Sequence, residues 1–450
     1  MPHNSEIVDT ASTSYTSIQV EDSDKELVLK IAAEISDEHH SQHYIFKVPV
    51  KLRHESNKDT YDPRIVSIGP YHRGEEGLNT TEPYKRRYLR DLTSRGTPTG
   101  TELAEFVSAI RNKEKLAREY YAAPFVLGSN EFVEMMLFDG CFILELLYKY
   151  SENENQTGKW DNDPIFGSTW MIYSLRKDLV LLENQLPFFV LENLFELTNS
   201  RSPIDLSLGE LVSKFFKPIV PNVSIEPLQP RTDSPVQPKS GKHILDFLRT
   251  DLLPAPSETE EDGNNPYWEF THSATDLSES GVKFRRKRNP DGLLDVTFTD
   301  GVLEIPPIVF GESWTILLPN LIALEQCRRD YPDRITSYVI LMDSLINSQD
   351  DVKILRKKQI IDRLFHEEEK VATDINNLFK GAVADKYYYD GLCHRMNAFC
   401  KRRVHRYQAS LNHDYFKTPW SILSVLAALI LLALTVTQTT CAFVKCNPKS

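Results

Sequence analysis

Apolar residues recur at spacings of three and four along most of this chain. That spacing is typical of helices that bury one face. It is clearest in Glu131–Tyr150 and Met171–Leu186, and it returns from Leu317 onward. Two more highly charged segments, Glu82–Leu92 and Glu102–Tyr121, also have helical composition. The chain is therefore predicted to be mostly α-helical, with only a minor β component.

The minor β component is predicted at one short stretch. Leu293–Phe298 and Val302–Ile305 are apolar runs separated by Asp300-Gly301, a pair that favours the tight turn of a β-hairpin. Polar or proline-rich composition predicts long loops at 151–164, at 218–242 with its six prolines, and at 254–266. We expect a globular body over residues 44–416, organised as one or two lobes.

The two ends of the chain differ from this body. Residues 1–40 are polar and acidic without a sustained apolar stripe, which predicts a disordered segment. By contrast, the 24 residues of Ser421–Val444 contain no charge. As a helix they would be about 36 Å long, and about 20 apolar residues are enough to cross the hydrocarbon core of a bilayer.

Trp420 precedes this uncharged segment, where an aromatic ring favours the level of the lipid headgroups. A buried core helix is the alternative interpretation, but so long a segment without charge is uncommon in a soluble core. The sequence therefore predicts one C-terminal transmembrane helix over residues 420–444, followed by a short tail of residues 445–450. The lipid bilayer is the first partner that we expect.

The charges beside this segment predict its orientation. Five basic residues precede it and two follow it: Lys401, Arg402, Arg403, Arg406 and Lys417, then Lys445 and Lys449. Because basic flanks favour the cytosolic side, the body is expected in the cytosol. The polar, acidic N-terminus has no apolar stretch of the kind found in signal peptides. These features predict a single-pass membrane protein with a C-terminal anchor.

Composition excludes several function classes. A net charge of −12 argues against general binding of nucleic acid. The six cysteines form no CxxC pair and have no histidine at the spacing of a zinc site, so no metal site is predicted. The sequence also contains no nucleophile elbow, Walker loop, dinucleotide fingerprint or HExxH pattern. No cofactor and no known catalytic chemistry are therefore expected.

Three acidic residues, Asp139, Glu183 and Glu325, fall on otherwise apolar helical faces. A carboxylate that faces a core needs hydrogen-bond partners, or it takes up a proton. One interpretation is an acid–base site in which Asp139 and Glu183 act together with His72. The favoured interpretation is structural: the acids accept from backbone N–H groups or pair with the basic run Lys85–Arg87.

A set of short phrases runs in order through the chain: Val66–His72, Met135–Glu145, Asp178–Phe189, Gly281–Phe284, Gly301–Pro307, Asn320–Cys327 and Tyr415–Trp420. In this order they resemble the plant family known as domain of unknown function 247. The resemblance implies a single-pass membrane protein of plants without an established activity. It also implies a role in recognition or signalling, and it supplies no catalytic residue.

The sequence thus favours a non-enzymatic recognition, signalling or interaction protein. Unknown protein partners are expected at the loops 151–164 and 218–242, because long loops in compact proteins are often functional. The alternative is an enzyme whose acid–base site matches no short motif and is built from Asp139, Glu183 and His72.

Overall fold

The computed structural model describes residues 24–25, 27–31, 42–55, 60–95, 102–155, 160, 162–199, 205–220, 241–253, 268–362, 367–378, 380–401 and 419–445. The chain divides into two compact units, Met1–Gln42 and His43–Ser450. In the first unit, residues 24–25 and 27–31 are helical. The rest of the segment predicted to be disordered lies outside the described residues, as do the predicted loop 254–266 and most of the loop 218–242.

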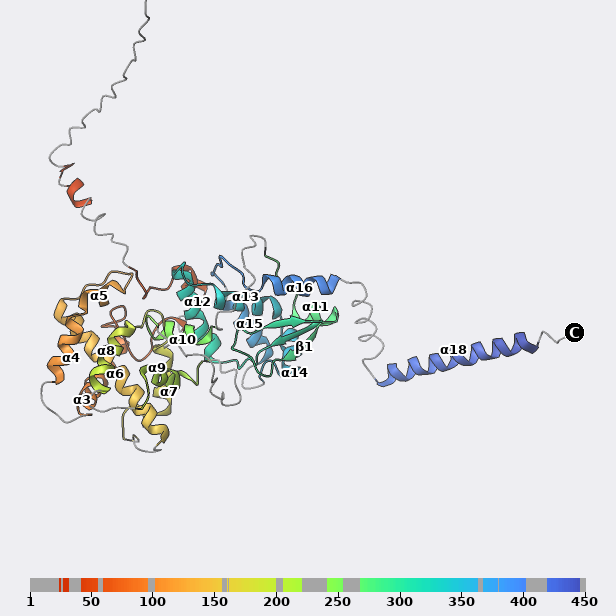
Figure 1. Cartoon of the computed structure of the whole chain (residues 1–450), viewed down its shortest axis with the longest axis horizontal. Coiled ribbons are helices and arrows are strands. Elements are labelled where there is room, and N and C mark those ends of the chain that lie inside the picture. The colour runs from red at the N-terminus through yellow and green to blue at the C-terminus, as the bar shows by residue number, and fades with distance from the viewer. Residues whose placement is uncertain are drawn as a thin grey trace, which may run out of the picture. The chain divides into compact units, whose positions relative to one another are not determined.

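Helix α6 (Ser129–Asn155) is the central helix of the first half of the body. It is buried on all sides, since from Met135 to Lys149 nearly every side chain is inaccessible to solvent. Five helices pack around it (Figure 1): α3 (Glu82–Thr93), α4 (Glu102–Arg111), α5 (Glu114–Glu119), α8 (Phe188–Asn199) and α9 (Leu208–Phe216). Gly140 lets α8 approach closely, because a Cβ atom there would lie 2.6 Å from Leu194.

The second half of the body is built around α12 (Leu318–Cys327), which is almost fully buried. It contacts a π-helical turn η3 (Ser313–Leu317), α10 (Ile244–Leu252) and α13 (Arg334–Leu345). The remaining elements are α2 (Val50–Glu55), η2 (Glu76–Thr81), α7 (Thr169–Asp178), α11 (Ala274–Glu279), α14 (Gln349–Lys357), α15 (Glu368–Leu378) and α16 (Asp390–Lys401). One hydrophobic core runs through both halves, from Ile45 to Met396.

A three-stranded sheet lies beside α11 and α14 (Figure 1). Its strand order is β1 (Lys283–Arg286), β3 (Val302–Ile305), β2 (Thr297–Thr299). The pair β2–β3 is antiparallel and is closed by Asp300 and Gly301, both with positive φ of 50° and 77°. The predicted turn and second strand are thus confirmed, whereas the first strand is Thr297–Thr299 and not Leu293–Phe298. The sequence missed β1, which pairs in parallel with β3 and contains a single apolar residue, Phe284.

The prediction of a mostly helical body is confirmed, with differences at the element ends. The segment Glu102–Tyr121 is two helices, α4 and α5, and not one. Helix α7 ends at Asp178, so the second half of the predicted helix Met171–Leu186 is irregular. The predicted loop 151–164 begins late, because α6 continues through Asn155.

The prediction of a transmembrane helix over residues 420–444 is wrong. Within the part of the chain that the structure describes, no helix combines the length and the apolar character needed to cross a membrane. Helix α18 (Pro419–Lys445) does cover the predicted segment, including Trp420, Ser421 and Val444. Its unbroken apolar run, Val425–Leu434, is ten residues, or about 15 Å of helix, which is half of the hydrocarbon thickness.

Absence of charge alone does not make a segment apolar throughout. Uncharged but polar residues follow the apolar run: Thr435, Thr437, Gln438, Thr439 and Thr440. The four threonine hydroxyls donate to backbone carbonyls of the preceding helical turn. The single-pass membrane character implied by the family resemblance is accordingly not supported. The orientation inferred from the flanking charges loses its basis, and the cytosolic location of the body stays a prediction.

Candidate functional site

Two irregular segments, 64–72 and 178–187, lie side by side in the interior and are joined by side-chain hydrogen bonds. The Asp178 carboxylate accepts from the backbone N–H groups of Arg64, Ile65 and Val66 at 2.8–3.2 Å. Asn184 accepts from Ile68 N–H at 2.7 Å and donates to the Val66 carbonyl at 3.1 Å. Buried backbone outside helices and strands needs such partners, so these side chains replace regular secondary structure.

Asp139 reaches the first of these segments from α6. It is 1% exposed, and its Oδ2 accepts from Gly69 N–H at 2.9 Å. Its Oδ1 lies 2.7 Å from Lys85 Nζ, and that ammonium also donates to the Ser67 carbonyl at 2.5 Å. Burial raises the pKa of Asp139, and the contact with Lys85 opposes that rise. Lys85 is thus the buried cation that pairs with this carboxylate.

Glu183 is 4% exposed and lies between the segment Val48–Arg53 and His72. Its Oε1 accepts from Val48 N–H and from Arg53, both at 2.6 Å. Its Oε2 lies 3.5 Å from His72 Nε2, which is an ion-pair distance and not a good hydrogen bond. Burial raises the pKa of Glu183, but the contacts with His72, Arg53 and Val48 outweigh it and hold the pKa below 4.5.

The structure therefore brings together His72 and Glu183, two of the three residues of the predicted acid–base site. Asp139 makes its contacts elsewhere, with Gly69 and Lys85. From the basic run Lys85–Arg87, Lys85 pairs with one of the predicted acids, Asp139. Arg87 lies instead 3.9 Å from Asp91 on its own helix.

Glu325, the third predicted acid, caps a helix. It is 3% exposed, and its Oε2 accepts from Thr336 N–H at 2.9 Å and from Thr336 Oγ1 at 2.7 Å. Its Oε1 accepts from Ile335 N–H and from Arg249, all at 3.2 Å. These amides belong to the first turn of α13, where the preceding Asp333 makes no capping bond of its own. Burial raises the pKa of Glu325, and Arg249 opposes that rise.

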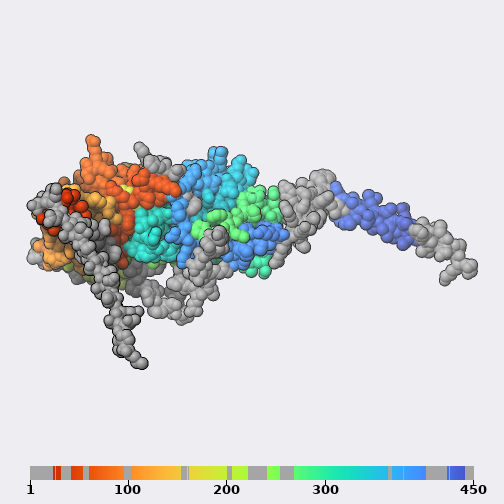
Figure 2. Space-filling model, turned by 90° about the horizontal axis from the view of Figure 1, so that it is seen from above, coloured from red at the N-terminus to blue at the C-terminus, as the bar shows by residue number. Residues whose placement is uncertain are grey.

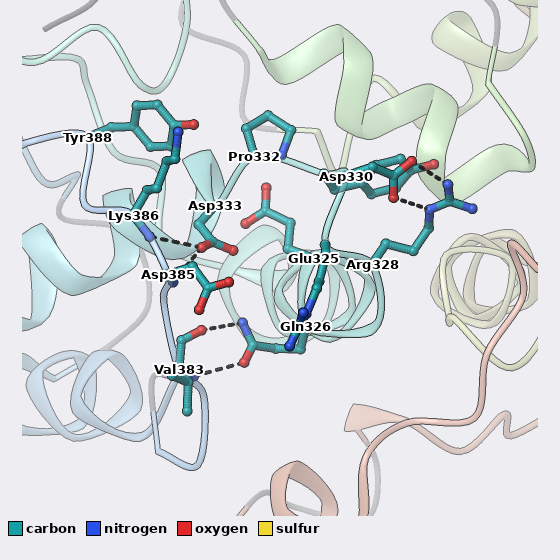
Figure 3. Close-up of a pocket in the computed structure, with 12 residues that line it drawn as sticks. Glu325, Gln326, Arg328, Asp330, Pro332, Asp333, Val383, Asp385, Lys386 and Tyr388 are labelled. Carbon is teal, nitrogen blue, oxygen red and sulfur yellow. Dashed lines mark hydrogen bonds and ion pairs between the residues drawn. The ribbon is translucent and has the colours of Figure 1, made fainter. Parts of the chain in front are cut away.

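Glu325 also lines a surface pocket of about 450 Å³, to which the residues 325–333 and 383–388 contribute. The lining residues are Glu325, Gln326, Arg328, Arg329, Asp330, Tyr331, Pro332, Asp333, Val383, Asp385, Lys386 and Tyr388 (Figure 3). In Figure 2 the cyan surface of the α12–α13 region borders the blue surface of later residues. We take this pocket as the candidate functional site.

The segment 383–388, which forms one wall of the pocket, is held in place by two side chains of the other wall and by Ser337 of α13. Gln326 exchanges two hydrogen bonds with the backbone of Val383, at 2.6 and 2.8 Å. Asp333 accepts from the N–H groups of Asp385 and Lys386 at 2.7 and 3.3 Å. Ser337 donates to the Lys386 carbonyl at 3.1 Å and accepts from Tyr388 N–H at 3.2 Å. The pocket is therefore preformed.

The charges around the pocket cancel. Four carboxylates line it, from Glu325, Asp330, Asp333 and Asp385, and three basic groups do so, from Arg328, Arg329 and Lys386. Arg249 behind Glu325 adds a fourth positive charge. Arg328 pairs with Asp330, but no described residue pairs with the side chains of Arg329, Asp385 or Lys386. The rim can thus still bind groups of either sign.

The described residues contain no group of three or more His, Cys, Asp or Glu side chains that could hold a metal ion. The sequence did not predict the pocket, because its two segments lie some 50 residues apart and neither has a recognisable motif. The polar run Arg328–Asp333 between two helices was the one available signal.

Known plant proteins are similar to this chain over most of its length. The model of DUF247, described as a plant protein of unknown function, matches residues 45–434. The UPF0481 protein At3g47200 of Arabidopsis thaliana is 31% identical over 421 residues, covering 88% of this chain and 86% of that protein. The putative UPF0481 protein At3g02645 of Arabidopsis thaliana is 23% identical over 485 residues, covering 87% and 88%. No solved structure matches the chain.

Proposed function

The chain belongs to the DUF247 family of plant proteins, and from that premise we propose that it is a non-catalytic recognition protein. In this proposal it binds a segment of a partner protein at the pocket between residues 325–333 and 383–388. The observation that carries the proposal is the contrast between the buried acids, which are fully engaged within the chain, and the pocket rim, which keeps charged groups available.

The engaged acids support a structural role. Asp139 and Glu325 each accept from backbone N–H groups and from a buried cation, Lys85 or Arg249. A general acid or base must instead reach the proton of a substrate, directly or through one water. Carboxylates that already hold the fold together in this way are poor candidates for proton transfer.

The alternative proposal is an enzyme with an acid–base site at Asp139, Glu183 and His72. The contact between His72 and Glu183 is the observation in its favour. Against it, Glu183 is also bonded to Val48 and Arg53, and His72 to Glu75. None of the three residues lines the pocket. The non-catalytic proposal accounts for these contacts without a further assumption.

The nature of the pocket favours a protein partner. Sites for small molecules and cofactors are usually lined mainly by apolar and aromatic side chains. This pocket is lined mostly by charged and amide groups, with Tyr331, Tyr388, Pro332 and Val383 as its larger apolar surfaces. A polar margin that includes arginines and tyrosines resembles the solvent-accessible rim of a protein interface.

Proximity labelling in plant cells tests the proposal, with the labelling enzyme fused to the N-terminus of the full chain. The test variants are Asp385→Lys and Arg329→Glu, which invert two exposed charges of the pocket rim. The matched control is Glu279→Lys, a charge inversion at an exposed position of α11.

We expect both rim variants to lose the same set of labelled proteins, while the control keeps that set. Inverted rim charges weaken a specific interface, whereas a distant exposed charge leaves it unchanged. If the rim variants keep every protein that the control keeps, the pocket is not the recognition site and the proposal is wrong.

A further inference from the structure

His72 occupies an unusual position, because both of its ring nitrogens face carboxylates. Nδ1 lies 2.8 Å from Glu75 and Nε2 lies 3.5 Å from Glu183. A neutral imidazole carries one N–H, so one nitrogen would then turn a lone pair toward a carboxylate. Only the protonated ring is attracted to both acids. The arrangement therefore depends on a proton that histidine gains or loses near neutral pH.

The groups around His72 strengthen this dependence. Arg53 from α2 is bonded to Glu183 and to Asp62, at 2.6 and 2.5 Å. The ammonium of Lys47 lies over the Tyr71 ring, 5.4 Å from its centre. Burial and Glu183 raise the pKa of the Cys327 thiol to about 12, so that group stays neutral. Arg53 thus pairs with Glu183 and Asp62, and His72 supplies the positive charge that faces both Glu75 and Glu183.

Glu183 is also the residue that holds the N-terminal segment of the body. It accepts from Val48 N–H, and through Arg53 it fixes α2. We propose that His72 is a proton-dependent latch: protonated, it stabilises Glu183 in the position that docks Val48–Arg53, and deprotonated, it loosens that segment. This inference does not depend on the proposed recognition function.

The direction of the pH effect follows from the contacts. Burial lowers the pKa of His72, but its contacts with Glu183 and Glu75 outweigh this and raise the pKa above 6.5. A raised pKa contributes stability that is fully present below the ordinary value and is lost as pH rises through the folded value. The latch is therefore closed at acidic pH and opens as the pH rises through the raised pKa of His72.

Hydrogen exchange followed by mass spectrometry on the full chain tests the latch. Exchange of the Val48–Arg53 amides is compared from about pH 5.5 to about pH 8.5, after correction for the intrinsic pH dependence of exchange. Protection should fall as pH rises, by about tenfold for each unit by which the pKa of His72 is raised. Ile346 N–H, which is bonded to the Met342 carbonyl at 3.0 Å at the end of α13, is the internal reference and should not change.

Three variants separate the latch from a general loss of structure. His72→Gln should give low, pH-independent protection of Val48–Arg53. Glu75→Gln removes one carboxylate at a half-exposed position, so the transition should move to lower pH with the fold intact. His272→Gln, at an exposed position, is the control and should behave as the unmodified chain.

Two results would overturn the inference. The first is protection of Val48–Arg53 that does not vary with pH in the unmodified chain. The second is a transition in Glu75→Gln at the same pH as in the unmodified chain. Because the Glu75 side chain is more than half exposed, Glu75→Gln should leave the fold intact, and the second result remains decisive even if His72→Gln fails to fold.

Discussion

Glu325 near the end of α12 accepts two hydrogen bonds from Thr336, one from its backbone N–H and one from its hydroxyl. Eleven residues apart in sequence, the two residues join consecutive helices and fix the angle at which the chain turns back. The same carboxylate pairs with Arg249 of α10. One buried side chain thus ties three helices together at the floor of the pocket (Figure 3).

Glu325→Ala should destabilise the protein strongly. The substitution leaves the Arg249 guanidinium buried without its acid and leaves two amides of α13 uncapped. Removing one partner of a buried ion pair costs about 3–5 kcal/mol. Urea denaturation followed by circular dichroism measures the free energy of unfolding. The control is Glu279→Ala at an exposed position, which should change it by less than about 0.5 kcal/mol. An equally small change for Glu325→Ala would contradict the structural role.

The pair of Asp139 and Lys85 should behave as one unit. Each of Asp139→Asn and Lys85→Met leaves a buried charge without its partner, so each should cost about 3–5 kcal/mol. The double variant removes both charges, so its loss should be smaller than the sum, by about 0.5–3 kcal/mol. Chemical denaturation of the three variants measures this difference. Additive losses would show that the 2.7 Å contact does not stabilise the fold.

Local features of the fold could be predicted from the sequence. The helices are predicted by the spacing of apolar residues. The hairpin turn is predicted by Asp300-Gly301, and both of these residues adopt a positive φ. Strand β1 was missed because its partner β3 lies beyond a long connection and because Phe284 alone does not make an apolar pattern. The segment Val425–Thr440 was misjudged because threonine and glutamine carry no charge yet remain polar.

Features that join distant segments were predicted only in part. Asp139, Glu183 and Glu325 could be recognised as buried, because each interrupts an apolar face. Their partners could not be recognised, since Val48, Gly69 and Thr336 contribute backbone groups that leave no trace in a sequence. Asp178 was overlooked, because inside the predicted helix Met171–Leu186 nothing distinguishes it from an ordinary exposed acid. The pocket was missed for the same reason, since it depends on contacts between remote segments.

Gly69 should tolerate no side chain. Its φ is +74°, and a Cβ atom would lie 2.7 Å from the Gln185 carbonyl oxygen. Gly69→Ala therefore combines backbone strain with a clash against buried backbone and should cost more than about 2 kcal/mol. Gly74 is the matched control, with φ of +85° and no atom within 4 Å of the position that a Cβ atom would take. Gly74→Ala should cost only about 1 kcal/mol. Thermal melting of both variants distinguishes strain from clash, and equal losses would contradict the close approach of segments 64–72 and 178–187.

Glu183 should stabilise the fold in a pH-dependent manner. Its pKa is held below 4.5 by His72, Arg53 and Val48, against the opposing effect of burial. A lowered pKa contributes stability that is present above the ordinary value and is lost as pH falls through the folded value. The unmodified chain should therefore melt well above Glu183→Gln at neutral pH, and the difference in melting temperature should shrink below about pH 4. The difference between the two proteins isolates Glu183 from the other carboxylates that titrate in the same range. A difference that stays constant down to about pH 3 would show that Glu183 contributes through packing and not through its charge.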